Sequence, residues 1–255
     1  MKIGVCTGVE NIKKMEDIGF DYIEPSVVSI AKMNDEEFNA AMNLVDGSNI
    51  KCEAFNVLFP GNIRLTGSEV DEGGIKDYLE RAFARVSRLG AKVIVFGSGG
   101  ARKIPDGWSR EEAWKQLVRI ARIAGDVAAE YGLTIAMEPL NTSETNILNS
   151  VEEGLRFVTD VGHTHVKLLA DFYHMRRENE DMDVLVKAGS IIAHLHIANS
   201  NGRVCPLDRS EDVYDAFFQK LKEVGYQGRI SIEAGIKDVD RDAPVGLNLL
   251  RELSK

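Results

Sequence analysis

Acidic and histidine side chains stand at or near the ends of four apolar segments in the C-terminal part of the chain. These residues are Glu138, Asp171, His196 and Glu233. Charged groups at the ends of apolar segments need partners, because burying an unpaired charge is costly. Three carboxylates and one imidazole make an oxygen-rich ligand set that suits Mn²⁺, Mg²⁺ or Co²⁺, with Zn²⁺ as an alternative. The residue types therefore predict a site for one divalent metal ion.

Alternation along extended strands indicates which of these side chains share a face. Residues two apart point to the same side of a strand, so Glu138 and Glu233 can both point inward from their segments. His194 and His196 share a face as well, and His196 lies nearer the strand end, which makes it the better ligand and His194 the better supporting residue. A single acidic residue at a strand end is more often a helix cap or a surface ion pair. Four consecutive strands that end in this way favour a metal site.

Eight short β-type segments alternate with longer amphipathic segments along the whole chain, which is typical of βα units and a parallel sheet. The predicted strands are Lys2–Cys6, Tyr22–Glu24, Cys52–Leu58, Lys92–Phe96, Leu133–Glu138, Val166–Asp171, Ile191–Ile197 and Arg229–Glu233. No GxGxxG motif follows the first strand, so the pattern favours a closed (β/α)8 TIM barrel over a doubly wound open sheet. We therefore expect an α/β fold with one barrel domain over residues 1–255. In such a barrel the active site lies at the carboxyl ends of the strands, where the four ligand candidates stand.

Composition narrows the range of partners. The formal net charge of −9 argues against a surface that neutralises nucleic-acid phosphates or binds anionic lipid. No apolar segment approaches membrane-spanning length, and no signal-peptide core precedes the first strand. The cysteines are Cys6, Cys52 and Cys205, an odd and scattered set without CxxC spacing, which favours reduced thiols over disulfides or a cysteine zinc site. We expect a cytoplasmic protein with a small-molecule partner.

Three sequence segments resemble the xylose isomerase-like barrel superfamily, in particular the sugar phosphate isomerase/epimerase branch that contains the D-tagatose and D-psicose 3-epimerase group. The segments are EPLNTSETNILN at residues 138–149, DFYHM at residues 171–175, and HLHIAN at residues 194–199 followed by Gly202 and Arg203. The sequence differs from these family segments at two places. Thr142 replaces an arginine that often follows EPLN, and Val204 to Leu207 replace the usual Pro-Gly after the arginine.

The resemblance implies a role for seven residues. Glu138, Asp171, His196 and Glu233 would hold the metal, and Glu144, His174 and Arg203 would contact substrate oxygens. It also implies a metal-dependent isomerase or epimerase acting on a sugar or sugar phosphate, and it is compatible with a homo-oligomer.

The chemistry of such a site is proton transfer next to a ketose carbonyl through an enediolate. If Glu138 and Glu233 face each other across the sugar, one removes the proton as a base and the other returns it as an acid. Return to the opposite face of the same carbon gives epimerisation, and return to the neighbouring carbon gives aldose–ketose isomerisation. The motifs leave both open.

Other functions share parts of this pattern. A keto-inositol dehydratase, which is a lyase, or a hydroxypyruvate-type isomerase would keep the same metal centre and differ in the pocket. An endonuclease IV-type DNA repair enzyme needs several metal ions and a basic groove, which the acidic charge opposes.

The glycine-rich loop at residues 97–100 follows the fourth strand and is more simply a turn than a phosphate cradle. Arg102 and Trp108 lie just beyond it, where they would either line a sugar pocket or pack within the loop.

Overall fold

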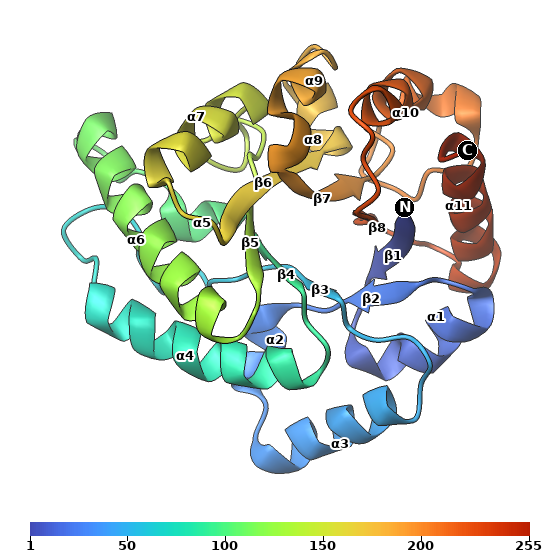
Figure 1. Cartoon of the computed structure of the whole chain (residues 1–255), viewed down its shortest axis with the longest axis horizontal. Helices are drawn as coiled ribbons and strands as arrows, with labels where there is room; N and C mark the ends of the chain where they lie inside the picture. The colour runs from blue at the N-terminus through green and yellow to red at the C-terminus, as the bar shows by residue number, and fades with distance from the viewer.

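Eight parallel strands form the centre of the molecule, and helices surround them (Figure 1). The computed structural model describes residues 1–255. The strands are β1 (Lys2–Cys6), β2 (Tyr22–Glu24), β3 (Ala54–Phe55), β4 (Val93–Phe96), β5 (Thr134–Met137), β6 (Val166–Asp171), β7 (Ile192–Ile197) and β8 (Arg229–Ile232). They pair in the order β2-β1-β8-β7-β6-β5-β4-β3. Isolated bridges from Tyr22 to Lys51 and from Ser26 to Asn56 join the two outer strands and nearly close the ring. The predicted (β/α)8 TIM barrel is confirmed.

The helices fill the connections between the strands. They are α1 (Ile12–Ile18), α2 (Val27–Lys32), α3 (Asp35–Asp46), α4 (Glu72–Arg88), α5 (Gly99–Arg102), α6 (Arg110–Glu130), α7 (Val151–Val161), α8 (Phe172–Arg177), α9 (Val184–Ala188), α10 (Tyr214–Glu223) and α11 (Val239–Leu253).

Local sequence signals begin and end several helices. The Asn34 side chain accepts from the Glu37 amide at 2.9 Å, and the Glu37 side chain accepts from the Asn34 amide at 2.8 Å, so a capping box begins α3. Ser109 caps α6 in the same position. Gly132 follows α6 with φ +64°, a backbone conformation that favours glycine, and turns the chain into β5.

The third strand is much shorter than predicted. The sequence predicts Cys52–Leu58, whereas regular pairing covers only Ala54–Phe55. Leu58 and Phe59 are buried, so the apolar pattern continues into a packed loop. Periodicity cannot separate such a loop from a strand, because both are buried.

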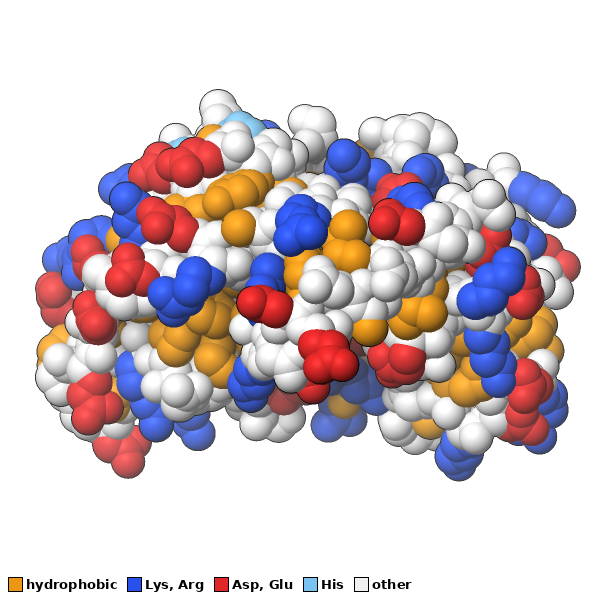
Figure 2. Space-filling model, turned by 90° about the horizontal axis from the view of Figure 1, so that it is seen from below, with side chains coloured by type: hydrophobic (Ala, Val, Ile, Leu, Met, Phe, Trp, Pro, Cys, Tyr) orange, Lys and Arg blue, Asp and Glu red, His pale blue; other side chains and the backbone are white.

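The outer surface is mixed in charge. On the face shown in Figure 2, Lys and Arg side chains are interspersed with Asp and Glu side chains, so this face carries no continuous basic area. None of the helices has the length and apolar character needed to cross a membrane.

Candidate active site

Four side chains converge at the carboxyl end of the barrel. Glu138 follows β5, Asp171 ends β6, His196 lies near the end of β7, and Glu233 follows β8. One potential ligand atom from each lies within 4.8 Å of those of the other three. Glu138, Asp171 and His196 are buried, and the Glu233 side chain is 20% exposed. The structure therefore brings together all four residues that the sequence indicates as metal ligands.

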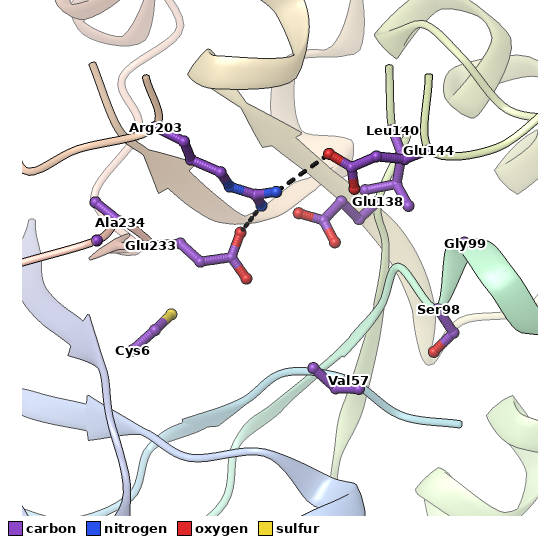
Figure 3. Close-up of a pocket in the computed structure, with 11 residues that line it drawn as sticks. Cys6, Val57, Ser98, Gly99, Glu138, Leu140, Glu144, Arg203, Glu233 and Ala234 are labelled. Carbon is purple, nitrogen blue, oxygen red and sulfur yellow. Dashed lines mark hydrogen bonds and ion pairs between the residues drawn. The ribbon is translucent and has the colours of Figure 1, made fainter. Parts of the chain in front are cut away.

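A pocket of about 470 Å³ opens beside this cluster. Glu138 and Glu233 point toward each other across it, from opposite sides of the close-up in Figure 3. The rest of the lining divides into two kinds. Glu144 and Arg203 add to the polar side, and apolar surface comes from Cys6, Val57, Leu140 and Ala234. A small ligand with both hydroxyl groups and C–H faces suits such a lining.

The His196 ring has two different surroundings. Its Nδ1 atom lies 3.0 Å from Oε1 of Glu138 and 3.4 Å from Oε2 of Glu233, so this nitrogen faces the cluster. Its Nε2 atom lies 2.9 Å from Oε1 of Glu24, on the side away from the pocket. Burial opposes protonation of the ring, but Glu24, Glu233 and Glu138 together raise the pKa of His196 well above its ordinary value.

Asp171 offers a buried oxygen that no protein group satisfies. Its Oδ1 atom accepts a hydrogen bond of 2.8 Å from the Tyr173 amide, and its Oδ2 atom has no hydrogen-bond partner. Burial, with the nearby carboxylates of Glu138 and Glu233, raises the pKa of Asp171 to about 8. A bare oxygen among three carboxylates and an imidazole fits the requirements of a divalent cation, which would relieve their repulsion.

The two facing glutamates differ in their surroundings. Burial and the charge of Glu233 raise the pKa of Glu138 above its ordinary value. Burial opposes ionisation of Glu233 as well, but His196 and Arg203 outweigh it and lower the pKa of Glu233 to about 2. Two carboxyl groups with pKa values pushed in opposite directions can serve as the base and the acid of one reaction.

Arg203 joins two acidic residues at the pocket. It donates to Oε2 of Glu233 at 2.5 Å and to Oε1 of Glu144 at 3.2 Å. Its guanidinium carbon lies 4.8 Å from the centre of the Tyr173 ring, which supports it from one side. Both Arg203 and Glu144 line the pocket, as expected of residues that contact a substrate.

His174 lies beneath the surface of the pocket, deeper than a residue that contacts substrate directly. It is buried next to Asp171, with Nε2 3.4 Å from Oδ2 of that residue, and it is not among the residues that line the pocket. Its Nδ1 atom accepts from the Asn141 backbone amide at 3.1 Å. Burial and the charge of Arg203 lower the pKa of His174 to about 3, so the ring is neutral and its proton is on Nε2.

Sequence reasoning missed Glu24, a buried carboxylate at the end of β2. It contacts the Nε2 atoms of both His194 and His196. Burial opposes its ionisation, but the two histidines hold the pKa of Glu24 below its ordinary range. A signal was present, because Glu24-Pro25 closes an apolar strand in the same way as Glu138-Pro139.

Arg102 and Trp108 do not line this pocket. Arg102 is fully buried and donates to the backbone oxygens of Phe96 and Leu148, each at 3.3 Å, so it ties the loop after β4 to the loop after β5. Trp108 is partly exposed in the loop before α6. The contacts of Arg102 support a role within the loop.

Comparisons with known proteins agree with this architecture. The D-psicose 3-epimerase of Agrobacterium fabrum is 28% identical over 234 residues, which cover 89% of this chain and 78% of that protein. The 3-dehydro-D-guloside 4-epimerase of Escherichia coli is 31% identical over 182 residues, which cover 66% of this chain and 65% of that protein. A crystal structure of D-psicose 3-epimerase in the presence of D-fructose superposes with a TM-score of 0.88 at 23% identity, covering 100% of this chain and 99% of that chain. The model of the xylose isomerase-like TIM barrel family matches residues 12–253, and the chain belongs to this family.

Proposed function

We propose that the protein is a divalent-metal-dependent isomerase or epimerase that moves a proton next to the carbonyl of a ketose. The observation that carries this proposal is the pair of facing glutamates, Glu138 and Glu233, beside a ligand cluster suited to a cation. The epimerase activities named for the relatives from Agrobacterium fabrum and Escherichia coli support the same reaction class.

Glu138, Asp171, His196 and Glu233 would hold one divalent ion. Their oxygen-rich chemistry favours Mn²⁺, Mg²⁺ or Co²⁺, with Zn²⁺ as an alternative. When bound, such an ion polarises the carbonyl and hydroxyl oxygens of the substrate and stabilises negative charge on them.

Glu233 is the group best suited to take the proton. Arg203 and His196 favour its ionised form, so it enters the reaction as a carboxylate that can accept a proton from the carbon next to the carbonyl. Glu138, whose environment favours the neutral form, can supply a proton from the other side of the pocket. The substrate loses one proton and gains one, so the step is balanced: return to the opposite face of the same carbon inverts that carbon, and return to the neighbouring carbon gives isomerisation.

The remaining polar groups would orient the sugar. Glu144 and Arg203 face the pocket and offer an acceptor and a donor to hydroxyl groups. His174 carries its proton beside Asp171 and would act on substrate oxygens only if its Nε2 atom becomes accessible when ligand binds.

We propose one catalytic domain over residues 1–255. The thiols of Cys6, Cys52 and Cys205 are all free, which supports a reducing compartment such as the cytoplasm.

Solvent deuterium labelling tests the reaction class. Free ketoses, sugar phosphates and keto-inositols are incubated with the Mn²⁺-loaded protein in deuterated water, and NMR identifies the labelled carbon. Label on an inverted carbon indicates epimerisation, label on the neighbouring carbon indicates isomerisation, and loss of water from a keto-inositol indicates a lyase. Absence of label in every ketose, with metal bound, contradicts the proposal.

A further inference from the structure

The carboxylate of Glu24 lies at the centre of a buried hydrogen-bond network inside the barrel. Its Oε1 atom lies 2.9 Å from Nε2 of His196. Its Oε2 atom lies 2.8 Å from Nε2 of His194 and 2.5 Å from Oγ of Ser231. The Tyr22 hydroxyl lies 2.7 Å from the same Ser231 oxygen. All five side chains are buried, so water does not compete for these contacts.

The direction of each hydrogen bond follows from the chemistry of the carboxylate. An ionised carboxylate only accepts, so both imidazole Nε2 atoms and the Ser231 hydroxyl donate to Glu24. Because the single hydroxyl proton of Ser231 is donated to Glu24, the Tyr22 hydroxyl must donate to the Ser231 oxygen. Three donors converge on one anion, which leaves Glu24 fully satisfied in the barrel interior.

This arrangement fixes the protons of both histidines. His194 Nδ1 has no hydrogen-bond partner, so a proton there would be buried and unpaired, and the single proton of this ring stays on Nε2. His196 likewise presents Nε2–H to Glu24. The ring of His196 can then turn only Nδ1 toward Glu138 and Glu233.

The barrel makes room for this network at β1. A Cβ atom on Gly4 would lie 2.3 Å from the Tyr22 ring, so only glycine lets the ring lie against this strand. In the strand order, β1 and β8 separate β2 from β7. Tyr22 and Glu24 therefore reach the histidines across the barrel interior.

We propose that Glu24 is a positioning residue that fixes the orientation and tautomer of His196, so that Nδ1 is the nitrogen available to a cation. The inference rests on the proposed function, because it gives His196 the role of a metal ligand. A carboxylate that accepts from the far nitrogen of a ligand histidine also makes the near nitrogen a stronger donor to the metal. Glu24 itself holds no metal in this account.

Glu24→Gln is the most direct test, because glutamine has nearly the same shape. Its amide oxygen accepts but its NH₂ group donates, so it can satisfy only one of the two histidines. We expect Mn²⁺ affinity, measured by calorimetric titration, to fall by about 10- to 100-fold. Glu53→Gln is the matched control, since Glu53 is a partly buried carboxylate that directly precedes β3 and pairs with Lys2 and Arg229, and it should leave Mn²⁺ affinity unchanged.

A second measurement is independent of metal. In the metal-free wild-type protein, the slowly exchanging low-field imidazole protons in a ¹H–¹⁵N NMR spectrum should include two that are assigned to Nε2–H of His194 and Nε2–H of His196, each of which donates to Glu24. Glu24→Gln should lose at least one of them, and Glu53→Gln should keep both. Circular dichroism checks that each variant is folded. If Glu24→Gln does not fold, Glu24→Asp replaces it in both measurements, because aspartate keeps the charge but its shorter side chain withdraws the carboxylate from both histidine rings.

The two measurements separate the two proposals. Wild-type Mn²⁺ affinity together with both imidazole protons in a folded Glu24→Gln variant overturns the positioning role. Failure of the wild-type protein to bind any divalent ion, with the two imidazole protons still present and dependent on Glu24, overturns the proposed metal centre but leaves the hydrogen-bond arrangement standing.

Discussion

Arg203 donates a 2.5 Å hydrogen bond to Oε2 of Glu233, whereas no arginine contacts Glu138. Together with His196 and the deeper burial of Glu138, this contact distinguishes two glutamates that share a cluster, a pocket and a position just beyond a strand end. It favours the ionised form of Glu233, and the repulsion that Glu233 then exerts favours the neutral form of Glu138. The base and the acid of the proposed reaction are distinguished in this way.

Replacing Arg203 should move the pH dependence of the reaction. Glu233 must be ionised to accept a proton, so activity is lost as pH falls through its pKa. Arg203→Met removes a cation that lowers this pKa, and the acid limb of the kcat/KM profile should shift to higher pH. Arg176→Met, which removes an arginine paired with Asp212 outside the pocket, should leave the limb in place. An unshifted limb in the Arg203 variant contradicts the base role of Glu233.

Metal binding should release protons near neutral pH. The pKa of Asp171 is raised to about 8 from its ordinary 3.8, so the metal-free site holds a proton that the ion must displace. Mn²⁺ affinity should therefore rise with pH up to about 8. Calorimetric titration in two buffers of different ionisation enthalpy measures the released protons directly. Equal heats in both buffers at pH 7 contradict the account.

The same shift predicts a loss of stability in the metal-free protein as pH rises. A carboxyl group with a raised folded-state pKa stabilises the fold fully below its unfolded pKa, and this contribution is lost as pH rises through about 8. Thermal unfolding should show a Tm that falls over this range in the wild-type protein. Asp171→Asn has no group to ionise at this position, so its Tm should fall less.

Gly4→Ala should destabilise the barrel. The added Cβ would lie 2.3 Å from the Tyr22 ring, which has to move away from Ser231. Overpacking of this kind typically costs about 1–3 kcal/mol, measured by urea unfolding. Gly61→Ala is the control, because nothing lies within 4 Å of a Cβ atom at that position. Equal stability of the two variants would show that the barrel interior tolerates the displaced ring.

The architecture could be predicted from the sequence because it depends on local patterns. The capping box at Asn34 and the glycine stop at Gly132 are read from a few neighbouring residues, and the structure has both. The convergence of Glu138, Asp171, His196 and Glu233 follows from one further rule, that parallel strands bring their carboxyl ends to one rim.

What the sequence did not reveal depends on distant packing. Glu24 is separated from His196 by 172 positions, and nothing local shows that a strand on one side of the barrel contacts a histidine on the other. From the sequence alone, a basic residue in a loop such as Arg102 is a candidate for binding a ligand. In the structure its guanidinium group instead donates to the backbone carbonyls of Phe96 and Leu148. The extent of β3 depends on pairing with β4 rather than on its own apolar pattern.

Deuterium exchange in variants of the two facing glutamates tests the central claim most directly. Glu138→Gln and Glu233→Gln each keep an oxygen for the metal but lose the group that carries the proton, and Glu130→Gln on the exposed end of α6 is the control. With Mn²⁺ occupancy confirmed for each variant, the formation of deuterium-labelled product should fall by about 100- to 10,000-fold in both active-site variants and remain unchanged in the control. Wild-type rates of labelled-product formation in both metal-loaded variants would contradict the account.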